Sequence, residues 1–276
     1  MLQKIKKCIA ILIIIVLLPY IITVFMNGKG VDTEKEISGP DALVKAHCIG
    51  VLAREVSQDY EEEMLKTQAL LVRTTVYKEV QEKGKAILEE EGFGDVTDIE
   101  SSWYRKLETI WEETEGQVIM YGDSLALVPF HQVSSGKTRI GAEVLGSEDY
   151  PYLKMRECPK DVEADNQMTS KFIDVKGAKV ATVDSAGYAL TVSVGEETVS
   201  AESFRDTYGL ASGCFELQEF EANTRVITKG VGHGLGLSQY TANEMAKEGK
   251  TYKEILQYFF EGTEIKEVAE IFWNVE

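Results

Sequence analysis

The sequence predicts an α+β fold in which a single-pass N-terminal membrane anchor precedes an extracytoplasmic domain of mixed helix and antiparallel sheet. Three observations lead to this prediction. An almost unbroken apolar run fills residues 9–26, apolar residues recur at helical spacing between residues 41 and 113, and a spacing of two replaces it after Gly116. A chain of 276 residues that is 44% hydrophobic can also bury a substantial core.

The apolar run at residues 9–26 is predicted to cross a membrane. About 18 residues at ~1.5 Å rise each span roughly 27 Å, close to the thickness of the hydrocarbon core of a bilayer. Three lysines and no acid precede the run (Lys4, Lys6 and Lys7), which places the N-terminus in the cytoplasm. A cleaved signal peptide would end in small residues, whereas this run ends in Val-Phe-Met, so an uncleaved anchor is favoured.

We therefore expect a protein of the cell membrane with three parts: a cytoplasmic stub and anchor (residues 1–29), a polar linker (30–40) and one extracytoplasmic domain (41–276). The net charge of −17 becomes more negative beyond Lys7, because the first residues carry lysines and no acid. Such a surface repels phosphate polymers, so nucleic acid is excluded as a partner, and anionic lipid surfaces are disfavoured. The acidity does not indicate a substrate.

Apolar spacing and turn residues place the main elements of the domain. They are helices at residues 41–55, 60–79, 103–113 and 244–260, and hairpins with turns at residues 121–124 and 184–187. The second helix shows one apolar stripe, formed by Leu65, Ala69, Val72 and Val76, which we expect to be buried.

Three cysteines fall in the extracytoplasmic domain. Cys48, Cys158 and Cys214 are an odd number without CxxC spacing. One disulfide plus a thiol and three buried thiols are both compatible with this pattern. Together with His131 they could form a metal site only if the fold brings them together over long sequence distances.

Residues 230–242, which read GVGHGLGLSQYTA, are the most informative stretch of the chain. Glycine occupies every second position of the first half, His233 lies among the glycines, and a polar trio follows, Ser238, Gln239 and Tyr240. Glycine at this density is costly to order and indicates backbone that adopts left-handed torsions or approaches another group closely. A glycine strand packed in the core is the alternative, but the polar side chains favour a loop that lines a ligand site.

Several sequence blocks, in a fixed order from about residue 41 to residue 263, carry a family resemblance. They are GVLARE (50–55), EMLKTQA (63–69) with VRT (72–74), TEGQV (114–118), FHQVSSGKT (130–138), FR (204–205) with GLAS (209–212), and GHGLGLSQY (232–240). These blocks resemble the stage II sporulation protein D family, whose domain also occurs in amidase-enhancer proteins. The N-terminal anchor fits this family too. Two positions depart from its pattern: Val56-Ser57 follow Glu55 where the family has Met-Pro, and Thr241 precedes Ala242 where the family has glycine.

The resemblance implies a lytic transglycosylase that cleaves peptidoglycan strands, preferably stripped of stem peptides, in septal wall thinning during sporulation engulfment. Such an enzyme can use one carboxyl group twice. The group protonates the glycosidic oxygen and then takes the proton of the C6 hydroxyl, whose oxygen closes on C1 to give a 1,6-anhydro sugar. The carboxyl must be protonated at neutral pH, so it needs a partly apolar pocket that raises its pKa.

Glu55 and Glu63 compete for this role. Glu55 follows an apolar run at the end of a helix, where the helix dipole and the apolar neighbours both raise its pKa. Glu63 begins the next helix, where the dipole lowers its pKa and keeps it ionised. Physical chemistry therefore favours Glu55 as the general acid and base and keeps Glu63 as the second candidate. Arg54 and Arg73 are candidate ion-pair partners of these acids.

The candidate substrate-binding residues come from the same blocks. They are His233, Gln239, Tyr240, Ser238, Ser212, His131, Ser134 and Arg73. His233 could line the cleft and steady a sugar acetamide or the charged transition state, or it could tie buried loops together, and its glycine surroundings favour the cleft. His47, on the first helix, is expected to be structural.

Two other functions remain open. A glycan-binding enhancer of a cell-wall amidase would hold strands without cutting them, and a zinc peptidase is disfavoured because no HExxH arrangement exists. Some relatives hold zinc through a histidine and nearby cysteines, but here no cysteine follows His131 before Cys158, so neither a metal nor another cofactor is expected. By the same resemblance, the expected partners are a sporulation amidase and a polytopic membrane protein that recruits both.

Overall fold

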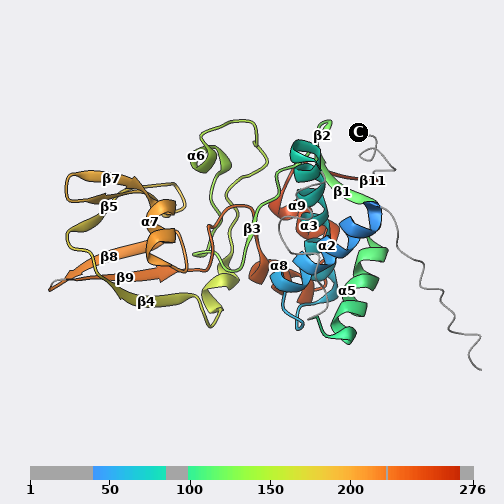
Figure 1. Ribbon diagram of the computed structural model, residues 1–276, viewed down its shortest axis with the longest axis horizontal. Helices are drawn as coiled ribbons and strands as arrows, with labels where there is room; N and C mark the ends of the chain where they lie inside the picture. The colour runs from blue at the N-terminus through green and yellow to red at the C-terminus, as the bar shows by residue number, and fades with distance from the viewer. Residues whose placement is uncertain (1–39, 85–98, 222, 268–276) are drawn as a thin grey trace, which may run out of the picture. The chain divides into compact units, whose positions relative to one another are not determined.

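The structure is a computed structural model that describes residues 40–84, 99–221 and 223–267 (Figure 1). The chain divides into two compact units, Met1–Leu43 and Val44–Glu276, and the fold described below is that of the second. The predicted anchor at residues 1–29 lies outside the described residues. Within the described ranges, no helix combines the length and the apolar character needed to cross a bilayer.

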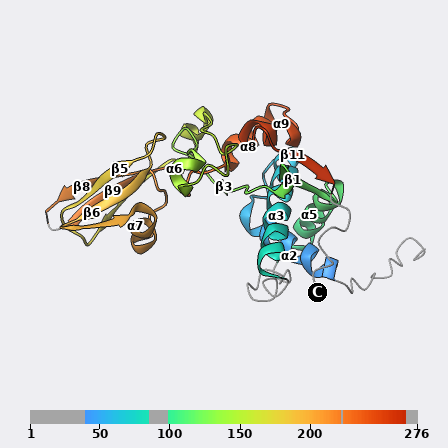
Figure 2. The same cartoon turned by 90° about the horizontal axis from the view of Figure 1, so that it is seen from above.

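Three helices near the start of the unit form one core. They are α2 (Pro40–Glu55), α3 (Glu62–Lys83) and α5 (Ser101–Glu113), and all three were predicted. They lie side by side in both views (Figures 1 and 2). Buried side chains from each helix meet in a shared cluster that includes Leu52, Leu65 and Leu107, none of which has any accessible surface. This packing places the end of α2, which carries Glu55, on a fixed scaffold.

Helix α3 is buried on two faces, where the sequence predicted one. The predicted stripe from Leu65 to Val76 packs against α2 and α5. The opposite face is buried as well, because Met64, Leu70 and Leu71 belong to a second cluster with side chains of α9 and β1. The stripe is therefore only half of the buried surface of this helix.

A three-stranded antiparallel sheet lies against α3. Its strands are β1 (Gln117–Tyr121), β2 (Ser124–Leu125) and β11 (Glu264–Glu267), in the order β11-β1-β2. Strands β1 and β2 form the hairpin predicted around residues 121–124, with Met120 opposite Leu125. The third strand comes from the end of the described chain and was not predicted.

The predicted helix at residues 244–260 is wrong in part, because two helices occupy this region. They are α8 (Gln239–Lys247) and α9 (Tyr252–Phe259). Gly249 adopts a left-handed φ of 86° between them. Thr251 then starts α9 with a capping box, in which its hydroxyl accepts a hydrogen bond from the Glu254 backbone N–H and the Glu254 carboxylate accepts one from the Thr251 N–H. The apolar spacing runs through residues 244–260 without a break, but Gly249 and the Thr251 cap divide this segment into two helices.

Two further antiparallel sheets share a third core. One has the order β4-β9-β8 and the other β5-β6-β7, and the second contains the predicted hairpin around residues 184–187. The strands are β4 (Met168–Ile173), β5 (Ala178–Val183), β6 (Ala189–Val194), β7 (Glu197–Ser200), β8 (Phe215–Phe220) and β9 (Asn223–Lys229). Helix α7 (Ala201–Tyr208) packs with them through Phe204 (Figure 2). Helices and antiparallel sheets in one unit confirm the α+β class.

Short elements connect the helices to these sheets. Strands β3 (Phe130–His131) and β10 (Leu237–Ser238) pair in parallel, so the histidine block and the glycine loop lie next to each other. Helix α6 (Gly141–Leu145) and a 3-10 helix at Pro159–Glu163 complete this region. Only β3 and β10 lie inside the sequence motifs, whereas α6 and the 3-10 helix lie between them.

Candidate functional site

The alternating glycines of residues 230–236 are required by the backbone and by close packing. All four have a positive φ, between 75° and 107°. A β-carbon on Gly234 would lie 2.3 Å from Cζ of Tyr188, and one on Gly236 would lie 2.0 Å from the carbonyl oxygen of Pro129. The prediction of left-handed torsions and close approach is confirmed, and both conditions hold at once.

This packing forms a small cleft. Its wall is formed by the end of α2, the β3 segment, α7 and the glycine loop. The lining residues are Glu55, Phe130, His131, Gln132, Arg205, Ala211, Val231, Gly232, His233 and Gln239. The volume is about 210 Å³, below the ~300 to 1,000 Å³ of pockets that enclose a whole small ligand. A cleft of this size fits one unit of a longer polymer. The structure therefore brings together four predicted residues: Glu55, His131, His233 and Gln239.

Among the described residues, Glu55 is the only one that brings a carboxyl group to this cleft wall. It is the last residue of α2, where the partial negative charge of the helix end disfavours ionisation. The residue as a whole is exposed, yet partial burial of the carboxyl group raises its pKa above the ordinary value. Both effects act in the direction that a general acid requires.

Gln239 connects this acid to the helical core. Its Nε2 donates a hydrogen bond of 2.9 Å to the backbone carbonyl of Glu55 and one of 3.3 Å to Oε1 of Gln68. Only 1% of Gln239 is exposed. Its amide N–H groups are thus directed at the protein, whereas the sequence analysis expected this side chain to bind sugar hydroxyls.

Glu63, the second candidate acid, is engaged elsewhere. Its Oε2 accepts a hydrogen bond of 2.7 Å from the backbone N–H of Tyr252, the first residue of α9. Its Oε1 lies 3.2 Å from Nζ of Lys66. Glu63 is not among the residues that line the cleft. These contacts give it a structural role between two helices and leave Glu55 as the acid that the geometry favours.

His131 and His233 are both held by the backbone of Leu235. Nδ1 of His131 lies 3.2 Å from the carbonyl oxygen of Leu235, so this nitrogen carries the hydrogen. Nδ1 of His233 accepts a hydrogen bond of 3.1 Å from the N–H of Leu235, so its hydrogen is on Nε2. The two ring centroids are 5.8 Å apart. The C=O and N–H groups of Leu235 therefore fix opposite tautomers in the rings of His131 and His233.

Both histidines are neutral at pH 7. Burial lowers the pKa of His131 to about 3, and the neighbouring His233 lowers it further, against a hydrogen bond to Leu235. Burial also lowers the pKa of His233; the Glu202 carboxylate and a hydrogen bond to the backbone of Phe130 oppose this effect, and Arg205 and Arg139 add to it. Nε2 of His131 is buried and has no hydrogen-bond partner in the described part of the chain. It is an unpaired acceptor that a ligand can reach only if the ring turns toward the cleft.

A buried ion pair supports the glycine loop, and the sequence analysis missed it. Nε of Arg139 lies 2.5 Å from Oδ2 of Asp184, in the turn of the β5–β6 hairpin, and both side chains are almost fully buried. Nη1 of Arg139 also donates a hydrogen bond of 3.1 Å to the carbonyl oxygen of His233. The pair thus holds the backbone of His233 against the hairpin. Arg139 adjoins a quoted block, but nothing in the sequence identified Asp184 as its partner.

Three predicted serines are buried and bonded within the protein. The hydroxyl of Ser238 donates a hydrogen bond of 2.7 Å to Oδ2 of Asp161. The backbone N–H of Ser134 donates one of 2.6 Å to the same oxygen. The hydroxyl of Ser212 accepts a hydrogen bond of 3.0 Å from the N–H of Cys214. None of the three lines the cleft, so their hydroxyl groups shape the loops around it.

Asp161 was also missed by the sequence analysis. It lies in the 3-10 helix and is completely buried. Besides the two serines, it accepts a hydrogen bond of 2.6 Å from the hydroxyl of Thr241 in α8. Burial raises the pKa of Asp161, while these hydrogen bonds lower it. This residue belongs to none of the sequence motifs, and only the fold reveals its contacts.

Arg73 and Tyr240 are not part of the cleft wall. The guanidinium of Arg73 is fully buried at the end of α5, where it donates to the carbonyl oxygens of Trp111 at 3.0 Å and Thr114 at 2.5 Å. The prediction that Arg73 binds substrate is corrected, because its donors cap a helix. Tyr240 is partly buried, and its backbone N–H donates to the carbonyl oxygen of Gln132.

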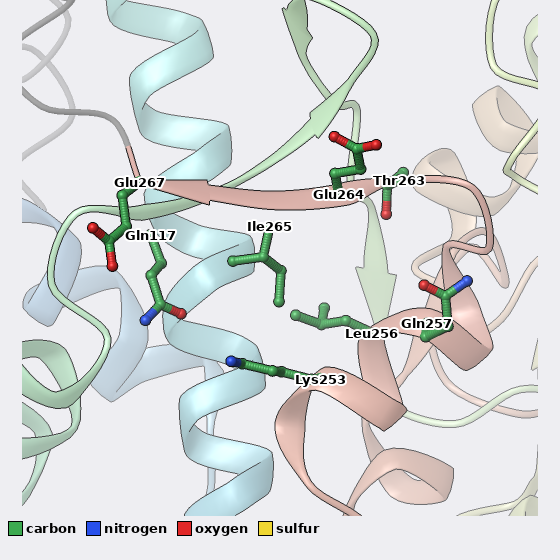
Figure 3. A pocket seen from close by; sticks show the side chains of 8 residues that line it. All are labelled: Gln117, Lys253, Leu256, Gln257, Thr263, Glu264, Ile265 and Glu267. Atoms are coloured by element: carbon green, nitrogen blue, oxygen red, sulfur yellow. The ribbon is translucent and has the colours of Figure 1, made fainter.

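Two larger hollows lie elsewhere on the unit. One is about 500 Å³ in volume and lies between α9, β11 and β1 (Figure 3). Its wall includes Gln117, Lys253 and Glu264, but no histidine and none of the predicted residues. The other, of similar volume, lies beside Trp103. The smaller cleft remains the candidate site, because among these three hollows of the described residues it is the one that combines an acid of raised pKa with two histidines.

The cysteines and histidines do not form a metal site in the described ranges. No group of three or more His, Cys, Asp or Glu side chains there is arranged to hold a metal ion. Cys48 and Cys158 are buried free thiols, and Cys214 is a partly buried one. Burial raises the pKa of Cys158 to about 12, so it stays protonated and is a poor ligand. The residues around His131 therefore do not fit the zinc of some relatives.

The fold and the cleft define a class: an α+β domain with one desolvated acid beside a glycine-rich histidine loop. The family described as "Stage II sporulation protein" matches residues 43–121. Stage II sporulation protein D of Bacillus subtilis (strain 168) is 29% identical over 263 residues, covering 84% of this chain and 76% of that protein. Stage II sporulation protein D of Bacillus amyloliquefaciens is 26% identical, covering 81% of this chain and 74% of that protein.

These matches confirm the family resemblance drawn from the motifs: the chain is similar to stage II sporulation protein D over most of its length, and residues 43–121 match the family model. A more distant relative is the amidase enhancer of Bacillus subtilis (strain 168). It is 21% identical over 283 residues, covering 78% of this chain and 39% of that protein.

Proposed function

We propose that this protein is a membrane-anchored lytic transglycosylase that cleaves the glycan strands of peptidoglycan during sporulation. The observation that carries the proposal is the position of Glu55. It is the single carboxyl group on the wall of a cleft that also presents two neutral histidines, and burial raises its pKa. Similarity to a sporulation protein and, more distantly, to an amidase enhancer supports the cell wall as the setting.

The number of carboxyl groups supports this reaction over hydrolysis. Most glycosidases need two, one as acid and one as base or nucleophile. A single group suffices when the sugar supplies its own nucleophile. Protonated Glu55 gives its proton to the glycosidic oxygen as the bond to C1 breaks. The resulting carboxylate then accepts the proton of the C6 hydroxyl while that oxygen bonds to C1, so Glu55 is regenerated and no water is consumed.

The histidines fit the task of binding an uncharged, hydrogen-bonding ligand. The unpartnered Nε2 of His131 can accept a hydrogen bond once the ring turns toward the cleft, whereas the ring of His233 is already paired with the backbone of Leu235 and Phe130. Because both rings are neutral, neither adds a positive charge that would hold Glu55 in its ionised form. His131 therefore suits a sugar hydroxyl or acetamide N–H, and neither ring opposes the acid.

Product analysis tests the proposal. The full-length chain is incubated with glycan strands that carry or lack stem peptides, and the new chain ends are identified by mass spectrometry. We expect 1,6-anhydromuramoyl ends. New reducing ends would instead identify a hydrolase, and they would refute the single-carboxyl mechanism.

The second candidate function is a glycan-binding enhancer of a cell-wall amidase, and the similarity to an amidase enhancer favours it. Such a protein would generate no new glycan ends. It would instead raise the rate at which a sporulation amidase releases stem peptides. Adding the chain to an amidase digest, with glycan ends and released peptides measured in the same sample, separates the two functions.

A further inference from the structure

One charged group on the cleft wall has no role in the chemistry described so far. Among the described residues that line the cleft, there is one acid, Glu55, and one residue with a permanent positive charge, Arg205. Arg205 comes from α7, whose last turn it occupies. It belongs to a sequence block that carries the family resemblance, but the sequence analysis gave it no function. Its side chain is 23% exposed.

The guanidinium of Arg205 is only partly used by the protein. Its Nη1 lies 3.2 Å from Oε2 of Glu202, one turn earlier on α7. Its Nε has no hydrogen-bond partner among the described residues. The Glu202 carboxylate is also shared, because its Oε1 lies 3.4 Å from Nη1 of Arg139. The cleft thus contains an arginine whose charge is incompletely compensated and whose Nε is left unpaired.

An unpaired arginine edge is suited to a carboxylate. The planar guanidinium donates two parallel hydrogen bonds to the two oxygens of one carboxyl group, a geometry that a lysine cannot reproduce. The Nε of Arg205 is covered by neighbouring atoms, so such pairing requires the side chain to turn toward the cleft. A neutral ligand group would gain much less from this arginine.

We propose that Arg205 is a specificity-determining residue that binds the lactyl carboxylate of a muramic acid unit in the glycan strand. The inference rests on the proposed glycan-strand substrate. In strands without stem peptides, the lactyl group of muramic acid ends in a free carboxylate, the one negative charge on the sugar. In strands with stem peptides, the same carbon forms an amide and carries no charge. Arg205 therefore selects stripped strands by their charge.

The acid chemistry and this recognition are compatible. Glu55 must be protonated to act, so it does not compete as an anion for Arg205. The two neutral histidines leave Arg205 as the one cation on the wall. A carboxylate bound there fixes one muramic acid unit relative to the acid, and so also fixes which glycosidic bond is presented to it.

A binding experiment tests the inference without relying on turnover. Three ligands are titrated by calorimetry against the full-length chain carrying E55Q, which prevents cleavage: stripped glycan strands, strands with stem peptides, and neutral N-acetylglucosamine oligomers of equal length. We expect the R205Q substitution to weaken binding of stripped strands about ten- to a hundred-fold, the range of a charge-assisted hydrogen bond. Binding of the neutral oligomers should change less than about two-fold, and R205K should recover only part of the loss.

Arg156 provides a matched control. It also pairs with a glutamate, Glu261, at 2.7 Å, its side chain is 19% exposed, and its Nε is also unpartnered in the described residues. It does not line the cleft. We expect R156Q to leave the binding of all three ligands unchanged.

The possible failures are distinguishable. If no ligand binds the E55Q chain, both the proposed function and the inference are rejected. Alternatively, the ligands bind while R205Q weakens the binding of stripped strands and of neutral oligomers equally, or weakens the binding of neither. In both cases the glycan site stands and the role of Arg205 is rejected.

Discussion

At the scale of single residues, Glu55 is the group on which the proposed chemistry depends. We predict that E55Q lowers strand cleavage by about 10²- to 10⁴-fold, because the amide is nearly isosteric but cannot supply a proton. The unfolding midpoint should not fall, since the substitution removes a carboxyl group that burial disfavours in its charged form. Cleavage is measured by the release of soluble fragments, and folding by circular dichroism on the same preparation.

Glu63 supplies the control for this experiment. E63Q removes the charge that faces Lys66 and weakens the hydrogen bond to the start of α9, so a small loss of stability is expected. Cleavage per folded molecule should be unchanged. A folded E55Q protein with full activity, together with an inactive E63Q protein, would exchange the roles of the two acids.

His131 gives a prediction about stability and pH. Its pKa is about 3 in the folded protein and about 6.5 in an unfolded chain, so between these values the unfolded state binds the extra proton. Stability contributed by the neutral ring is therefore complete above pH ~6.5 and falls as the pH decreases toward 3, by at most about 1.4 kcal/mol per pH unit. Urea unfolding of the wild type and H131Q between pH 7 and pH 5 should show a shallower dependence for H131Q. Parallel curves would contradict the burial of this ring.

At the scale of elements, substitutions at two glycines distinguish the cost of a left-handed torsion from the cost of close packing. Gly234 and Gly249 both have a left-handed φ, of 79° and 86°. A β-carbon at Gly234 would overlap the ring of Tyr188, whereas one at Gly249 would meet nothing within 4 Å. We predict that G249A costs about 1 to 2 kcal/mol of unfolding free energy, the torsional part alone. G234A should cost at least about 1 kcal/mol more and should also reduce glycan binding. Equal losses in denaturant unfolding would show that the glycine loop can move away from Tyr188.

Gln239 offers a second prediction at this scale. Because its amide holds the carbonyl end of α2, Q239L should leave the Glu55 carbonyl unpaired and let the acid shift. We expect kcat to fall at least about ten-fold while KM changes little. A residue that binds sugar hydroxyls would instead raise KM. Steady-state kinetics on stripped strands distinguishes the positioning role from direct substrate contact.

The elements also show what the sequence could predict. Helices α2, α3 and α5 and two hairpins follow from local apolar spacing and turn residues, so they were found. The division between α8 and α9 depends on Gly249 and the Thr251 cap, which interrupt a continuous apolar pattern. Strands β4 and β8 were missed because several of their apolar side chains are exposed, Met168, Phe172 and Phe220 among them. Strand β9 was missed because two of its three buried residues, Thr224 and Thr228, are threonines, so its alternating burial gives no apolar alternation.

The candidate site was predictable only where a motif is visible in the sequence. Glu55, His131 and His233 lie in distinctive blocks, and the structure brings them to one cleft. Arg139, Asp184 and Asp161 escaped notice because their partners are distant in the chain, and long-range pairing leaves no local pattern. The serines were misjudged for the same reason, since a hydroxyl beside a ligand and one beside a buried carboxylate look alike in sequence.

At the scale of the whole molecule, the expected membrane attachment can be tested directly. The anchor predicted at residues 9–26 lies outside the described residues. We predict that the full-length chain sediments with membranes and is extracted by detergent but not by high salt. A variant starting at residue 30 should be soluble, and protease added outside intact cells that have lost their wall should digest the domain. Protection of the domain from that protease would reverse the predicted orientation.

Helix α3 has a consequence for how the molecule opens. Each of its faces completes a different core, so the helix cannot detach from one core without uncovering the other. Its backbone amides should therefore exchange with deuterium only when the helical part unfolds as a whole. The cluster that holds α7 contains no residue of α3 and can open independently of it. Glu55 thus belongs to the part that opens slowly. Arg205 belongs to a part that can unfold locally without α3. The two walls of the cleft are therefore expected to fluctuate on different timescales.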